Sequence, residues 1–411
     1  MFIKKLFFGK LLRKICLVLC ISFLFYSSPV YANELETALA ETEVTETASS
    51  IEITSESAIL MEALTGKVLF ENNADEVLSP ASITKIMTLI LIFDALHEGE
   101  ISLNDMVTTS AYAKSMGGSQ VFLEEGEKQT VETLIKCIVV ASGNDASVAM
   151  AEYISGSEEE FVVKMNEKAA QLNMTNTNFE DCCGLADSDN HYTSARDVAL
   201  MSRYLITNYP EISDYSSIWM ETIIHKTNKG ESEFVLSNTN KLLKMNKYVT
   251  GLKTGSTSKA KYCLSATAQK DNVELIAVIM AAPDYKTRFS EANQLINYGF
   301  SCCRVYTDTD NDSLNELSVK GAIDIDLKCK YEEEFSYAFT NGENNENVTK
   351  EISFFEEIKA PVDKGDIVGT IKYYYLGETI GEVNIVADEK IEKAGIKEWF
   401  LYALSVYFCK Q

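Results

Sequence analysis

Three short motifs in this chain carry residue types that could activate a serine without a histidine. S-x-x-K occupies residues 82–85, S-x-N occupies 142–144 and K-T-G occupies 253–255. A serine hydroxyl becomes an effective nucleophile when a neighbouring base accepts its proton. A lysine can be that base when burial or nearby positive charge lowers its pKa. The three motifs, in this order, therefore predict a serine acyl-transfer site.

The first motif places the expected nucleophile and base one helical turn apart. Ser82 and Lys85 have the i, i+3 spacing that puts two side chains on one face of a helix. The apolar run 83–97 predicts a buried helix, and the turn signal just before it places Ser82 at the N-terminal end. We therefore expect Ser82 to be the nucleophile and the desolvated Lys85 to be the general base.

The second motif falls where a helical pattern is interrupted. Residues 130–153 predict two helices separated at 142–144, because Ser, Gly and Asn favour caps and turns over helix interiors. We expect Ser142 to bridge two lysines and to relay a proton to the leaving amine. The side chain of Asn144 can both donate and accept, which suits a substrate amide.

The third motif lies on a predicted strand. Lys253 would lower the pKa of the first lysine and, with Thr254, hold a substrate carboxylate. Gly255 has no side chain, so a substrate could lie against the strand edge. The backbone N–H groups of Ser82 and Ser256 are the expected oxyanion hole.

Each motif also occurs elsewhere by chance. Residues 256–259 repeat S-x-x-K and residues 188–190 repeat S-x-N, but the first does not open an apolar helix and the second lies in a polar segment. The three histidines, at 97, 191 and 225, belong to no motif that resembles a catalytic triad. The order of the chosen motifs on suitable elements favours chemistry over chance.

The two ends of the chain differ in composition from its middle. Residues 1–32 join a basic start to a short apolar run and a small final residue, which is typical of a secretory signal peptide; an uncleaved anchor is the alternative. Residues 33–50 lack Lys and Arg and predict an acidic linker. Residues 390–411 predict an amphipathic helix that is too short to cross a bilayer and lies on the membrane surface. The alternative is a helix packed on its own protein or on a partner.

Two folded domains are expected between these ends. Residues 51–300 mix strand and helix patterns, and residues 301–389 alternate in the manner of strands, so we predict an α/β (α+β) domain followed by a small all-β domain. A net charge of −24 argues against nucleic-acid binding. The ten cysteines include no C-x-x-C pair, so we expect no zinc site and read most of them as small buried apolar residues.

Longer stretches around the motifs resemble one family. AILMEALTGKVLFENNADEVLSPASITKIMT, VASGNDASVAMAEYI and VTGLKTGSTSKAKYCLSATA are similar to D-alanyl-D-alanine carboxypeptidases, the low-molecular-mass penicillin-binding proteins of peptidase family S11 (DacA/DacF-like). The similarity resumes at APVDKGDIVGTIKYYYLGETIGEVNIVADEKIEKA, which resembles the family's C-terminal β domain.

The resemblance implies a β-lactamase/transpeptidase-like domain, a β domain and a membrane anchor. It implies removal of the terminal D-alanine from peptidoglycan stem pentapeptides through an acyl-enzyme on Ser82, which β-lactam antibiotics also acylate, with no cofactor and no metal. The expected location is the extracytoplasmic face of the membrane or the cell wall, and the Lys-, Ile- and Asn-rich sequence is typical of a Gram-positive bacterium.

The chain departs from the family pattern at two positions. Ser256 stands where the family usually has His after K-T-G, and Cys183 replaces the His of a usual His-Gly-Leu. We expect the first replacement to affect substrate orientation or the rate of deacylation, and the second to have a structural role. Arg288 stands where the family often has an arginine, either to bind a carboxylate or for structure.

Three other functions share parts of this sequence pattern. A D,D-endopeptidase would use the same site and differ in loop shape. A class A β-lactamase needs a further carboxylate, and no clear E-x-x-L-N motif follows Ser142 before Lys253. A non-catalytic wall-binding or sporulation scaffold has no physical reason to keep the whole motif set.

Overall fold

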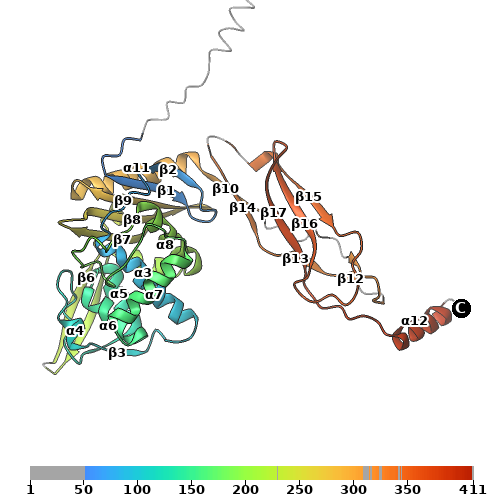
Figure 1. The fold of residues 1–411 in the computed structure, drawn as a ribbon, viewed down its shortest axis with the longest axis horizontal. Coiled ribbons are helices and arrows are strands. Elements are labelled where there is room, and N and C mark those ends of the chain that lie inside the picture. The colour runs from blue at the N-terminus through green and yellow to red at the C-terminus, as the bar shows by residue number, and fades with distance from the viewer. Residues whose placement is uncertain are drawn as a thin grey trace, which may run out of the picture. The chain divides into compact units, whose positions relative to one another are not determined.

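A five-stranded antiparallel sheet organises the first half of the described chain (Figure 1). The computed structural model describes residues 51–409 except 229, 309–313, 315–316, 324–325, 341–342 and 344, so the expected signal peptide and acidic linker lie outside the described residues. The strand order is β2-β1-β9-β8-β7, which leaves β7 at an edge. The strands are β1 (Ser57–Glu62), β2 (Val68–Asn72), β7 (Val249–Thr257), β8 (Lys261–Lys270) and β9 (Val273–Ala282).

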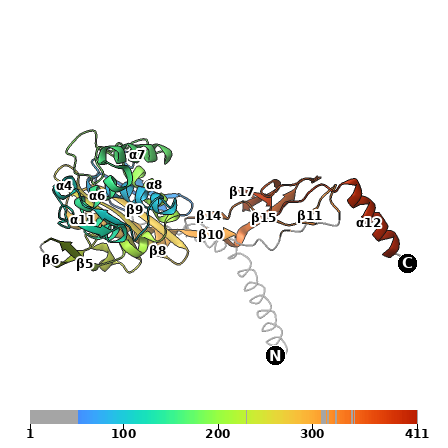
Figure 2. The same ribbon diagram turned by 90° about the horizontal axis from the view of Figure 1, so that it is seen from below.

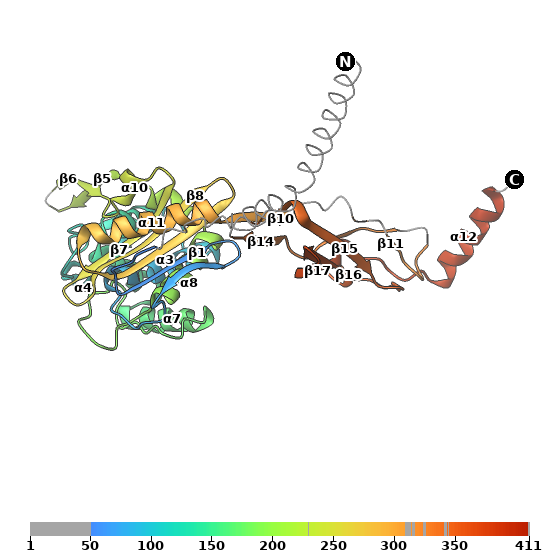
Figure 3. The same ribbon diagram turned by 90° about the horizontal axis from the view of Figure 1, so that it is seen from above.

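Helices cover both faces of this sheet, which explains its nearly continuous apolar strands. Helix α11 (Tyr285–Cys302) lies on one face, whereas α3 (Lys85–His97) and α8 (Ala195–Asn208) lie on the other (Figures 1 and 3). A Cβ at Gly299 would lie 2.7 Å from Leu275 Cδ1, so this glycine lets α11 pack closely on β9.

The helical layer beside α3 contains the predicted interruption. Helix α5 (Val131–Val140) ends just before residues 141–143, and α6 (Asn144–Ser155) follows, which confirms the two predicted helices. Helix α7 (Glu158–Gln171) begins at a capping box-like start, where Ser157 Oγ accepts from the Glu160 N–H. The shorter elements are η1 (Ala81–Thr84), β3 (Met106–Thr108), α4 (Ala111–Lys114), β4 (Lys128–Thr130), α9 (Ile212–Ser216), β5 (Met220–Thr227), β6 (Gly230–Ser237) and α10 (Leu242–Met245).

The second half is all-β, as the alternation predicted. A four-stranded antiparallel sheet has the order β13-β17-β16-β15 (Figure 1). Strand β10 pairs with β14, and the two lie side by side in Figure 2. The buried carboxylate of Asp308 accepts from Tyr373 Oη at 2.8 Å and from Lys350 Nζ at 3.0 Å. The elements are β10 (Arg304–Asp308), β11 (Leu317–Ser318), β12 (Asp326–Leu327), β13 (Cys329–Tyr331), β14 (Phe335–Phe339), η2 (Asn345–Asn347), β15 (Val348–Phe354), β16 (Ile367–Tyr375) and β17 (Glu378–Ala387).

The last helix exposes apolar side chains. Helix α12 (Ile396–Cys409) carries Phe400 and Tyr407 at 63% and 68% exposure. Within the described part of the chain, none of the helices combines the length and the apolar character that a bilayer crossing requires.

Candidate active site

Ser82 and Lys85 meet across a tight turn. Ser82 lies in the 3₁₀ turn η1, and Lys85 is the first residue of α3, so the α-helix begins two residues later than predicted. Side chains at i and i+3 eclipse each other in a 3₁₀ turn. Lys85 Nζ accordingly lies 3.0 Å from Ser82 Oγ. Thus the predicted pair is adjacent, through a tighter geometry than an α-helix offers.

The Lys85 side chain is fully buried, and its position suits a neutral amine. Nζ also lies 2.6 Å from Asn144 Oδ1 and 2.7 Å from the Cys183 carbonyl oxygen. Burial lowers the pKa of Lys85 below its ordinary value. A neutral amine would donate its two N–H groups to these oxygens and direct its lone pair at the Ser82 hydroxyl. This arrangement is that of a general base.

Ser142 and Lys253 form a second pair beside the first. Lys253 Nζ donates to Ser142 Oγ at 2.9 Å and to the Thr254 carbonyl at 3.0 Å. Burial, followed by the charges of Lys85 and Arg288, holds the pKa of Lys253 well below its ordinary value. Ser142 has φ +61°, a left-handed conformation that is strained for a non-glycine residue and clusters at functional sites.

Asn144 holds the base in place. Its Oδ1 accepts from Lys85 Nζ, and its Nδ2 donates to the Gly117 carbonyl at 2.7 Å. The backbone approaches closely here, because a Cβ at Gly118 would lie 2.9 Å from Asn144 Nδ2. Both polar ends of the amide are therefore engaged within the protein, and one N–H of Nδ2 and one lone pair of Oδ1 remain for a substrate amide.

Two glycines allow close backbone contacts with the turn that carries Ser82. A Cβ at Gly255 would lie 2.8 Å from the Pro80 carbonyl oxygen, and a Cβ at Gly184 would lie 1.8 Å from that of Ala81. The glycine of K-T-G therefore lets β7 approach the nucleophile's turn. This close approach is a second reason for the glycine, beside the prediction that a substrate could lie against the strand edge there, and Gly255 also lines the cleft.

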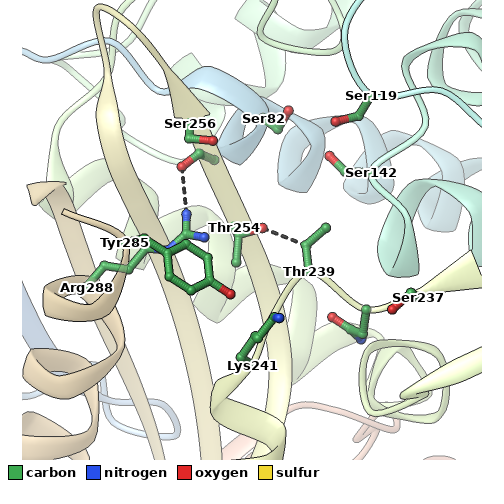
Figure 4. A pocket seen from close by; sticks show the side chains of 12 residues that line it. Ser82, Ser119, Ser142, Ser237, Thr239, Lys241, Thr254, Ser256, Tyr285 and Arg288 are labelled. Atoms are coloured by element: carbon green, nitrogen blue, oxygen red, sulfur yellow. Dashed lines mark hydrogen bonds between the residues drawn. The ribbon is translucent and has the colours of Figure 1, made fainter.

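Of the residues described so far, Ser82, Ser142, Thr254 and Gly255 line a cleft of about 340 Å³ (Figure 4). Ser82 and Ser256 lie together at one end, and Thr239 and Lys241 lie toward the other. The described lining residues include the cations Lys241 and Arg288 but no carboxylate, although the chain is strongly acidic. They are Ser82, Ser119, Ser142, Ser237, Asn238, Thr239, Lys241, Thr254, Gly255, Ser256, Tyr285 and Arg288. The cleft is suited to an anionic ligand.

Arg288 supports β7 and also reaches the cleft. Its Nη1 donates to the carbonyl oxygens of Gly255 and Cys263 at 3.1 and 3.3 Å, and its Cζ lies 4.9 Å from the centroid of the Tyr285 ring. Burial lowers the pKa of Arg288. Because the ordinary pKa of a guanidinium group is very high, Arg288 stays charged. Both roles considered from sequence are therefore compatible with its position.

Sequence reasoning missed the segment 237–241. Thr239 Oγ1 and Thr254 Oγ1 lie 2.6 Å apart, and Asn240 Nδ2 donates to the Gly251 carbonyl at 2.9 Å. The N-x-N pattern was the available signal, since asparagines that bond backbone groups fix a loop beside a strand. This loop places Lys241 at the cleft.

The other candidate groups have structural partners. His191 Nδ1 accepts from the Glu180 N–H at 3.0 Å, so the proton on Nε2 faces Thr84 Oγ1 at 2.8 Å. His191 is therefore a positioned core residue and lies outside the cleft lining. The described cysteines are all free and are mostly buried, as predicted; they are Cys137, Cys182, Cys183, Cys263, Cys302, Cys303 and Cys329.

One described group of side chains could hold a metal ion. Potential ligand atoms of Glu158, Cys182 and Cys183 lie within 4.8 Å of one another. The Glu158 carboxylate already accepts from the Cys182 N–H at 3.0 Å and from Tyr112 Oη at 2.7 Å. This group therefore has hydrogen-bond partners without a metal, and none of its members lines the cleft.

Comparisons with known proteins agree with the geometry. Residues 42–284 match the family described as D-alanyl-D-alanine carboxypeptidase, and residues 309–393 match the C-terminal domain of penicillin-binding protein 5. The chain is 43% identical over 340 residues to D-alanyl-D-alanine carboxypeptidase DacF of Bacillus subtilis, covering 82% of this chain and 86% of that protein. It is 36% identical over 353 residues to DacC of Escherichia coli, covering 82% and 84%.

A solved structure extends the similarity to the fold. Penicillin binding protein 5 from Haemophilus influenzae has a TM-score of 0.69 at 32% identity and covers 83% of this chain and 98% of its own. The chain belongs to the peptidase S11 family of D-alanyl-D-alanine carboxypeptidases, as its sequence motifs indicated.

Proposed function

We propose that this protein is an exported serine D-Ala-D-Ala carboxypeptidase that removes the terminal D-alanine from peptidoglycan stem pentapeptides. The observation that carries the proposal is the 3.0 Å contact between the buried Lys85 amine and Ser82 Oγ. The lining of the cleft adds support, because its exposed cation Lys241 forms no ion pair with any described residue. An anionic C-terminus is the substrate feature that such a lining favours.

In the acylation step, Lys85 takes the proton of Ser82 and Oγ attacks the carbonyl carbon of the penultimate D-alanine. The N–H groups of Ser82 and Ser256 stabilise the oxyanion. Ser142, hydrogen-bonded to Lys253, passes a proton to the amine as the C–N bond breaks, and D-alanine leaves. The proton that Lys85 took from Ser82 passes to Ser142, which restores the Ser142 hydroxyl and the neutral Lys85 amine. Water then attacks the acyl carbonyl carbon as Lys85 takes its proton, and Lys85 returns that proton to Ser82 Oγ as the ester bond breaks.

The edge strand β7 gives the substrate its direction. An extended peptide can add to a free sheet edge as a further strand. The terminal carboxylate lies near Thr254, Arg288 and the cation-bearing end of the cleft. The acyl part of the peptide therefore runs the other way, past Ser256 toward Thr257.

β-Lactam antibiotics would acylate Ser82 through the same base and oxyanion hole. Export would follow from residues 1–32, and α12 would hold the enzyme on the outer face of the cell membrane through its exposed aromatic side chains. The similarity to the Bacillus subtilis relative supports a Gram-positive source.

The test is D-alanine release from a peptide that ends in D-Ala-D-Ala, with Ser82→Ala as the control. Release that requires Ser82 supports the proposal. Labelling of Ser82 by penicillin without such release would favour a D,D-endopeptidase, which the same catalytic groups could serve and which cross-linked dimeric muropeptides would reveal. The names of the relatives favour the carboxypeptidase over a β-lactamase or a non-catalytic scaffold.

A further inference from the structure

A second pocket lies along β7 beyond the catalytic cleft. Ser256 lines the cleft, and the next two residues of the chain, Thr257 and Ser258, line a separate pocket of about 430 Å³. Ser79, which precedes the turn that carries Ser82, lines it too. The pocket is completed by the loop residues Leu185, Ala186 and Asp187 and by Lys259. The pocket is therefore adjacent to the acyl side of the site in the proposed binding direction.

The pocket combines an apolar surface with an unpaired carboxylate. Leu185 is 43% exposed and Ala186 lies beside it. Asp187 is exposed and forms no hydrogen bond or ion pair with any residue that the structure describes. Lys259, in contrast, is engaged, because its Nζ donates to Asp189 Oδ1 at 2.6 Å and to the Ser188 carbonyl at 2.8 Å.

This surface complements an aliphatic arm that ends in an amine. Methylene groups would cover Leu185 and Ala186, and the ammonium group would pair with Asp187. The contrast with the catalytic cleft supports this direction, because the described lining of the cleft holds cations and no carboxylate. The two ends of the extended site therefore have opposite charge preferences.

We propose that this pocket binds the side chain of the stem-peptide residue that precedes the two D-alanines, and that it selects a diamino acid whose side-chain amine is free. This inference rests on the proposed function, since that function sets the direction of the peptide. Asp187 is here a specificity-determining residue. Lysine and diaminopimelate share the required chemistry, and the second also carries a carboxylate at the end of the arm, which the remaining N–H of Lys259 can reach.

The test compares peptides of the form acetyl-X-D-Ala-D-Ala on the full protein. X is L-lysine with a free side-chain amine, Nε-acetyl-L-lysine, or diaminopimelate with its distal carboxylate free or amidated. We expect kcat/KM for D-alanine release to be about threefold to fivefold higher with the free amine than with the acetylated one, which is the upper part of the range of an exposed ion pair. Asp187→Asn should bring this ratio to about one by the same reasoning, because the free amine loses its partner.

A matched control variant distinguishes an effect of the Asp187 side chain in the pocket from a general effect of negative charge in the same segment. Glu180→Gln removes one negative charge from an exposed side chain of the same segment that does not line the pocket, and should keep the preference. A wild-type ratio near one, an unchanged ratio in Asp187→Asn, or an equal loss in Glu180→Gln would each overturn the proposal. The two diaminopimelate peptides distinguish the two possible ligands. If the peptide with the free distal carboxylate reacts faster than the amidated one, and Lys259→Gln removes this difference, the ligand is diaminopimelate. Equal rates for these two peptides would show that only the shared amine is recognised.

A second readout keeps this inference separate from the proposed function. Each peptide is also tested for protection of Ser82 against a fluorescent penicillin, which measures peptide binding without turnover. Absence of D-alanine release from every peptide would refute the carboxypeptidase. The proposed role of the second pocket would then be supported if protection depends on the free amine and on Asp187, and refuted if it depends on neither.

Discussion

Lys253 Nζ lies 2.9 Å from Ser142 Oγ, although the two residues are 111 positions apart in the chain. Lys253 comes from the edge strand β7, and Ser142 from the left-handed residue between two helices. Both lysines of the site are almost completely buried, and none of the described residues that line the cleft carries a carboxylate to balance them. The site therefore lowers the pKa values of these two lysines through desolvation. The cations that line the cleft, Lys241 and Arg288, have no carboxylate beside them in the described lining and can attract an anionic substrate.

The roles of Ser82 and Lys85 can be separated by acylation kinetics. Ser82→Ala should abolish labelling by a fluorescent penicillin, because no nucleophile remains. Lys85→Ala should slow the second-order acylation rate by about 10²–10⁴-fold, the usual range for removal of a general base. Persistent labelling of Ser82→Ala would show that another serine reacts, and a loss below tenfold in the lysine variant would remove Lys85 from the mechanism.

The acylation rate should depend on the protonation of Lys85. The reactive form is the neutral amine, and burial lowers the pKa of Lys85 below the ordinary 10.5. The rate constant should therefore rise with pH through this lowered pKa and fall away on its acidic side. A pH profile of penicillin acylation measures it, with Lys85→Arg inactive at every pH since arginine does not lose its proton. A midpoint at the ordinary lysine value would contradict this account.

Gly255→Ala tests the contact between β7 and the nucleophile's turn. The added Cβ would lie 2.8 Å from the Pro80 carbonyl oxygen, so strand and turn must separate. We expect a loss of about 1–3 kcal/mol in the free energy of unfolding, typical of overpacking, together with slower acylation. Gly117→Ala is the control, because a Cβ there meets nothing within 4 Å. Equal behaviour of the two variants would show that the close approach is unimportant.

The buried polar cluster of the β domain should contribute to stability alone. Tyr373→Phe removes one of the donors to the Asp308 carboxylate, which should cost about 1–3 kcal/mol. Tyr374→Phe removes an exposed hydrogen bond to Glu351 and should change stability by less than about 0.5 kcal/mol. Thermal unfolding reports the difference, and penicillin acylation should be the same in both variants.

Helix α12 should bind a membrane surface through its apolar side chains. Phe400→Ser combined with Tyr407→Ser replaces two exposed aromatic side chains and should release the protein from phosphatidylglycerol vesicles in a sedimentation assay. Acylation of Ser82 in solution should not change. Continued sedimentation of the double variant, or no sedimentation of the wild type, would favour a helix that packs on protein instead.

Much of the catalytic site could be predicted from the sequence alone. Ser82 and Lys85 are three residues apart, so local backbone geometry alone brings them together, and the break at 142–144 follows from the preferences of Ser, Gly and Asn. The all-β second half followed from period-2 alternation. These inferences depend on neighbours in the chain, which a sequence displays directly.

Other features depend on contacts between distant segments. That Gly255 accommodates Pro80, that Asn144 holds Lys85 and that Lys241 lies at the cleft follow only when a strand, a turn and a loop are packed together. The second pocket belongs to this group, because residues 185–187 and 257–259 meet only in the fold. Spacing in sequence determined which residues could react, whereas long-range packing decided which of them are buried, held or left open to a substrate.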